Sequence, residues 1–169
     1  FWFDAIKKIV TSYRVYEKRD SLSSIKAAFS TLIKYDKLPD SLKVISDGNP
    51  IYNVAVEYWS QYGFPFKLYQ VIGLTNQDDT SKEYRSQKQI IERFNRTLKY
   101  YYRPKGGFTS LDNANSYMVL FATYNNFLRP NKALEWKTPV QLDELNGISN
   151  MPNKWICLLY TSPSPRDRS

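Results

Sequence analysis

The chain has 169 residues, of which 42% are hydrophobic and 16% aromatic, so it can bury the core of one domain. Its formal net charge is +8 and it has no histidine, which excludes histidine-based zinc sites and Ser-His-Asp or Cys-His catalytic groups within this segment. The chain contains no apolar run of about 18 residues, so no transmembrane helix is predicted. Because the chain has no histidine, carboxylates are the candidate metal ligands, and they suit Mg²⁺ or Mn²⁺.

Hydrophobic periodicity and turn residues predict eight elements of secondary structure. In chain order these are strands over 1–9 and 10–16, a helix over 21–37, a strand over 42–46, a helix over 50–62, a strand over 67–72, a long helix over 82–103 and a last helix over 112–128. Asp20 or Ser21 is predicted to cap the first helix, and Gly63 to end the second. The order is typical of an α/β sandwich, in which Asp47 follows the third strand at the edge where such sheets hold their sites.

The long helix is strongly amphipathic and strongly basic. Its apolar stripe has helical spacing and consists of Ile90, Ile91, Phe94 and Leu98. Its polar line consists of Lys88, Glu92, Arg96 and Lys99. Residues 82–105 hold eight basic and two acidic residues, so +6 of the net +8 lies here. A positive face this localised indicates a polyanionic partner, with nucleic acid ahead of a membrane surface.

Two interpretations of this helix remain open from its residues alone. Glu92 is either a metal-binding carboxylate flanked by phosphate-binding cations, or a solvated residue paired with Arg96 one turn later. The tyrosines at 100–102 either stack on DNA or, as is more common at this spacing, pack in the core.

The C-terminal segment has a separate explanation. Residues 157–167, CLLYTSPSPRD, match an in-frame reading of a common sequencing-library adapter. We therefore expect a core domain over 1–150, the end of the native chain over 151–156, and an artefact over 157–169. Cys157, the single cysteine, belongs to this last segment and says nothing about the redox compartment.

Four segments, in the right order, resemble DDE transposases and retroviral-type integrase cores. They are VISDGNP over 44–50 (the second-aspartate segment), IIERFNRTLK over 90–99 (the glutamate helix), GFTS over 107–110 (the turn after it) and YNNFLRPNKALEWKTP over 124–139 (the closing segment). The resemblance covers roughly residues 1–156 and points to transposases of prokaryotic insertion sequences. It implies an α/β fold with a ribonuclease H-like mixed sheet flanked by helices, truncated at its N-terminus.

The resemblance also implies a site and an activity. Asp47 and Glu92 would be catalytic and would bind two Mg²⁺ (or Mn²⁺) ions, which support in-line phosphoryl transfer. The implied contacts to the DNA backbone are Lys88, Arg93, Arg96 and Lys99. The implied partners are transposon-end and target DNA and further copies of the chain, in the cytoplasm of a prokaryote, associated with the nucleoid.

Two departures from the family pattern bear on this site. The first catalytic aspartate is expected upstream of the given chain, so we interpret Asp4 as a hairpin-turn residue and expect the chain as given to be inactive. Glu83 is separated from Asp47 by 35 residues, the best-known family interval, and Glu92 by 44, but the surrounding motif favours Glu92. The alternatives are a non-catalytic DNA-binding remnant or regulatory module, and a structure-specific nuclease of the same fold.

Overall fold

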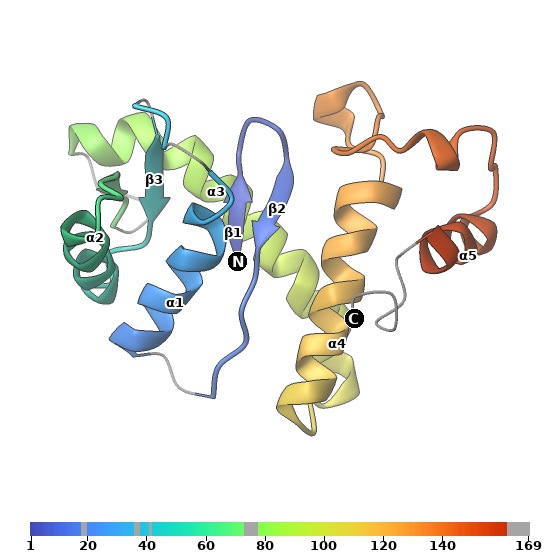
Figure 1. Ribbon diagram of the computed structural model, residues 1–169, viewed down its shortest axis with the longest axis horizontal. Helices are drawn as coiled ribbons and strands as arrows, with labels where there is room; N and C mark the ends of the chain where they lie inside the picture. The colour runs from blue at the N-terminus through green and yellow to red at the C-terminus, as the bar shows by residue number, and fades with distance from the viewer. Residues whose placement is uncertain (18–19, 36–37, 41, 73–77, 162–169) are drawn as a thin grey trace. The chain divides into compact units, whose positions relative to one another are not determined.

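The computed structural model describes residues 1–17, 20–35, 38–40, 42–72 and 78–161 (Figure 1). The chain forms two compact units, Phe1–Val119 and Leu120–Ser169, and each is described by itself. The boundary falls inside a helix, α4, which spans Leu111–Thr123.

The first unit contains the predicted elements in the predicted order. They are β1 (Trp2–Asp4), β2 (Ile9–Ser12), α1 (Ser21–Leu32), β3 (Lys43–Ser46), α2 (Ile51–Gln61), β4 (Lys67–Gln70), α3 (Asp79–Tyr102) and the start of α4. A 3₁₀ turn that was not predicted, η1 (Arg103–Lys105), lies between α3 and α4. The long helix begins at Asp79 rather than residue 82, and the first helix ends at Leu32 rather than near residue 37. Residues 73–77, between β4 and α3, lie outside the described part of the chain.

The strands form two small sheets, where the family resemblance implied a single mixed sheet. β1 pairs antiparallel with β2, and β3 pairs parallel with β4, so the described strands form two separate two-stranded sheets. Strand propensity is local, but the choice of a pairing partner depends on the packed fold. Here helices connect the two sheets, because α1 packs on β1 and β2 and also on α2, and α2 packs on β4. Helix α3 packs on β3 and β4. In Figure 1 α1 lies between the hairpin and α2.

Helix α1 and its neighbours form the core of the first unit. Ala28 and Leu32 are fully buried with Phe66, against partly buried aromatic rings that include Trp2 and Trp59. A capping box starts α1, because the Asp20 side chain accepts a hydrogen bond from the Ser23 N–H at 2.7 Å and the Asp20 N–H donates to Ser23 Oγ at 3.1 Å. The predicted cap at Asp20 is therefore confirmed.

The second unit continues α4 into a short π-helix, η2 (Tyr124–Leu128). The last helix was predicted as regular α-helix to residue 128, but the Arg129 N–H donates to the Tyr124 carbonyl, five residues back, at 2.7 Å. Two 3₁₀ turns follow, η3 (Lys132–Leu134) and η4 (Asp143–Leu145), and then helix α5 (Met151–Thr161). Residues 157–161, which were expected to belong to an artefact, are part of α5.

Candidate functional site

A capping residue fixes where helix α3 begins, and an apolar stripe fixes which of its faces packs against the rest of the first unit. Asp78 caps it, accepting a hydrogen bond from the Ser81 N–H at 2.9 Å. The predicted apolar stripe is confirmed for Phe94 and Leu98, which are buried. The Phe94 ring centroid lies 5.1 Å from that of Phe3, so the middle of α3 is held on β1. Of the polar line, Arg96 and Lys99 are exposed, whereas Lys88 and Glu92 are partly buried.

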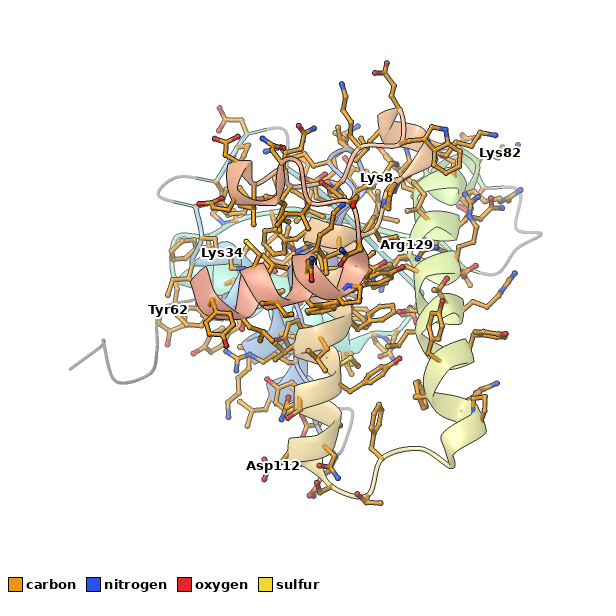
Figure 2. All side chains as sticks on the ribbon, turned by 90° about the vertical axis from the view of Figure 1, so that its right-hand side faces the viewer. Lys8, Lys34, Tyr62, Lys82, Asp112 and Arg129 are labelled. Carbon is orange, nitrogen blue, oxygen red and sulfur yellow. The ribbon has the colours of Figure 1, made fainter. Side chains whose placement is uncertain are left out.

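The polar line borders a cleft of about 630 Å³ in the first unit. The lining comes from one face of the second half of α3 and from η1, in groups that recur about every turn: Glu92, Asn95, Arg96, Lys99, Tyr100, Arg103 and Pro104. Three cations against one carboxylate give the lining a net charge of +2. In Figure 2, α3 runs down from Lys82, and nitrogen-tipped side chains project from it. The cleft can therefore attract an anionic ligand.

Glu92 pairs with the cation one turn before it. Lys88 Nζ lies 3.3 Å from Glu92 Oε1, and the Lys88 side chain is only 11% exposed while that of Glu92 is 41% exposed. Among the described residues the pair with Arg96, which the sequence left open, is not formed. Lys88 therefore restrains the position of the Glu92 carboxylate. It is also the least exposed of the four cations that were predicted to contact DNA.

The other predicted cations are not equivalent. Arg96 and Lys99 line the cleft beside Glu92. Arg93 lies outside the lining, and its Nε donates a hydrogen bond to the Gln89 carbonyl at 3.3 Å. Arg103 also lines the cleft. It was missed as a site residue, although its spacing of four residues from Lys99 continues the same helical line.

Asp47 lies on a short turn directly after β3 and is exposed. Its Oδ1 accepts the Asn49 N–H at 3.3 Å, and its carbonyl accepts the Gln70 side-chain amide, also at 3.3 Å. A Cβ at Gly48 would lie 2.8 Å from Ile72 Cγ1, so the absence of a side chain lets this turn approach the segment after β4. The prediction that Asp47 stands at the carboxyl end of a strand is confirmed.

Glu83, the rival glutamate, lies near the opposite end of β3. Its Oε1 is 3.7 Å from Nζ of Lys43, the first residue of that strand. Lys43 also donates a hydrogen bond to Tyr84 Oη at 2.9 Å, and this bond is the main reason that the pKa of Lys43 is raised above its usual value. Glu83 thus has a structural partner at the start of the strand, whereas Asp47 follows its end.

The two predicted metal ligands fit the chemistry of Mg²⁺ in kind. Asp47 and Glu92 both offer accessible carboxylate oxygens, the donors that this ion prefers. Glu92 lines the cleft and Asp47 is not among the lining residues. Within the described ranges, no group of three or more His, Cys, Asp or Glu side chains is arranged to hold a metal ion.

The structure resolves two further expectations from the sequence. Asp4 is confirmed as a hairpin-turn residue, because its Oδ1 accepts the N–H groups of Ile6 and Lys7, each at 2.8 Å. The tyrosines at 100–102 are not core as a group, since Tyr100 is 73% and Tyr101 51% exposed. In the described parts of the chain, no helix combines the length and the apolar character that a membrane span requires.

Comparisons with known proteins bear on this same helix. Residues 80–139 match the sequence model of a family described as "Integrase core domain". No curated protein and no solved structure matches the chain. The mixed α/β arrangement of small sheets and helices is compatible with such a domain. The segment that carries Glu92 and its basic neighbours is therefore similar to an integrase core domain, which supports an integrase- or transposase-like relationship.

Proposed function

We propose that this protein acts on DNA as a transposase of the DDE type, with a ribonuclease H-like fold, and cleaves and joins DNA strands. One observation carries the proposal. The segment that matches an integrase core domain includes α3 from residue 80 onward, and α3 places Glu92 in a cleft together with Arg96, Lys99 and Arg103. A carboxylate among phosphate-binding cations is the combination that metal-dependent phosphoryl transfer needs.

Each group has a defined role in this proposal. Arg96, Lys99 and Arg93 bind phosphate oxygens and position the DNA backbone, as Lys88 was also predicted to do. Lys88 in addition keeps the Glu92 carboxylate in place through their 3.3 Å pair. Asp47 and Glu92 would hold two Mg²⁺ or Mn²⁺ ions. When bound, these ions would activate the attacking oxygen and stabilise the leaving oxygen.

The partners in this proposal follow from the four resembling segments. The protein would bind the ends of a prokaryotic insertion sequence and a target DNA, in the cytoplasm at the nucleoid. Bringing two ends together would require at least two copies of the chain.

Titration with Mn²⁺, followed by isothermal calorimetry, tests the metal site. Loss of a residue that only supports a metal ligand weakens binding by about 10- to 100-fold, so Glu92→Gln or Asp47→Asn should cost no less than about ten-fold. Glu83→Gln is the matched control and should bind as the wild type does, because Glu83 is paired with Lys43. Unchanged Mn²⁺ affinity in Glu92→Gln would overturn the assignment of Glu92.

A second candidate function is a DNA-binding or regulatory module without catalysis. One observation favours it: Asp47 does not line the cleft that holds Glu92. A gel-shift assay on duplex DNA, run beside the Mn²⁺ titration, separates the two functions. DNA binding without Mn²⁺ binding supports the module, whereas Mn²⁺ binding that depends on Asp47 and Glu92 supports the transposase.

A further inference from the structure

We propose that the exposed end of α3 binds unpaired DNA bases, with the Tyr100 ring as the stacking surface. This inference rests on the proposed action on DNA and adds the form of DNA that the cleft takes. The exposed end of α3 is defined here by Arg96, Lys99, Tyr100 and Tyr101 of α3 together with Arg103, the first residue of η1.

Tyr100 is presented to solvent instead of being packed. Its side chain is 73% exposed and lines the cleft, and its ring meets the ring of Tyr101 edge to face, with centroids 5.4 Å apart and an angle of 80°. An edge-to-face neighbour covers at most one of the two faces of a ring, so the Tyr101 contact leaves a face of Tyr100 uncovered. Two neighbouring exposed aromatic rings form an apolar surface that fits a ligand with flat apolar faces.

The next tyrosine shows why this end of the helix is firm enough to act as a platform. Tyr102 is half-buried and stacks on Phe108, with ring centroids 5.0 Å apart and an angle of 30°. Phe108 in turn contacts Tyr117 at 5.3 Å. These three rings belong to the first unit and tie the end of α3 to the middle of α4. Tyr100 therefore projects from a supported backbone.

Cations lie on both sides of the Tyr100 ring along the helix. Arg96 is one turn before it and Arg103 is about one turn after it, while Lys99 is adjacent in sequence. All three line the cleft with Tyr100. A basic groove that follows the phosphates, with an aromatic ring on which a base stacks, is the usual construction of a single-strand binding site.

The exposed ring is what favours single-stranded over duplex DNA. A duplex offers its phosphates to the cations, but its base faces are hidden in the stack, so Tyr100 gains nothing from it. An acidic peptide would also use only the cations. Unpaired bases, as at a frayed or cleaved DNA end, use both the cations and the ring.

Fluorescence anisotropy on a labelled single strand, and on the same sequence as a blunt duplex, tests this inference without any metal. Tyr100→Ala should weaken single-strand binding by about five-fold or more, while duplex binding changes by less than about two-fold. Tyr100→Phe keeps the ring and should retain single-strand binding. Tyr62→Ala is the matched control, because Tyr62 is 61% exposed at the end of α2 and, in Figure 2, lies on the other side of the view from α3.

A second readout detects stacking directly. A 2-aminopurine base in the single strand should lose fluorescence on binding to the wild type and to Tyr100→Phe, but not on binding to Tyr100→Ala. Equal losses of single-strand and duplex affinity in Tyr100→Ala, or no loss of either, would overturn the inference and leave a surface that binds phosphates only. Failure of the Mn²⁺ titration would instead overturn the metal site and leave this result standing.

Discussion

The two ends of α3 carry similar residues in different surroundings. At its beginning Glu83 pairs with Lys43, and Tyr84, only 5% exposed, packs against the Tyr69 ring with centroids 4.4 Å apart. At its end Tyr100 is 73% exposed and lies in a cleft with three cations. The sheet of β3 and β4, which packs on α3, accounts for these two surroundings. Where β3 and β4 cover the helix, charges and rings are used for stability, and at the far end they remain available to a ligand.

Truncation of one tyrosine at each end of α3 should have the largest effect. Tyr84→Ala removes a packed ring and should lower the Tm by roughly 6–12 °C, as large-to-small changes do in a chain of this size. Tyr100→Ala removes an exposed ring and should shift the Tm by less than about 2 °C. Thermal unfolding followed by circular dichroism measures both. Similar losses in the two variants would show that the ends are not different in kind.

Removal of positive charge tests whether the basic residues at the exposed end of α3 contribute more to DNA binding than other exposed basic residues do. The triple variant Arg96→Ala, Lys99→Ala and Arg103→Ala should weaken duplex binding. It should also reduce the slope of log K against log salt by about 0.9 for each phosphate that the variant no longer neutralises. The matched variant Lys7→Ala, Lys67→Ala and Lys82→Ala removes the same charge from exposed positions elsewhere in the first unit. Equal slopes in the two triple variants would mean that only the overall charge matters.

The smallest expected effect concerns the pH dependence of the packed end. The hydrogen bond to Tyr84, with smaller help from Glu83, raises the pKa of Lys43. A raised pKa in the folded state stabilises the protein below the unfolded value of about 10.4, and this contribution is lost as the pH rises through the folded value. The effect is small because the Lys43 and Glu83 side chains are 49% and 61% exposed.

Urea unfolding between about pH 9 and pH 11.5 measures this contribution. Because Lys43→Met lacks the titrating group, the difference in unfolding free energy between wild type and this variant should shrink as the pH rises. Tyrosines and lysines that do not interact with Lys43 titrate alike in both proteins and cancel in the difference, whereas Tyr84 and Tyr69 interact with Lys43 and contribute to it. A difference in unfolding free energy that is constant with pH would mean that Lys43 acts through packing over the rings of Tyr69 and Tyr84. The centroids of these rings lie 5.7 and 5.2 Å from Lys43 Nζ.

The local features of the site could be predicted because they depend on neighbours in sequence. The polar line of α3 follows from helical spacing, and its continuation through Arg103 was available from the same spacing. The turn at Asp4 follows from a short polar side chain that bonds to its own backbone. The exposure of Tyr100 could not be predicted, since it depends on which elements pack on the helix.

The order of the elements, the amphipathic character of α3 and the position of Asp47 at the end of a strand could all be predicted from the sequence. These features depend on periodicity, capping and turn chemistry, which act over a few residues. Three features depend on the packing of the folded chain. The described strands pair as two small sheets, Glu83 forms an ion pair with Lys43, and Glu92 forms an ion pair with Lys88 while it lines the cleft. Such choices depend on side chains brought together by packing, and local sequence alone does not specify them.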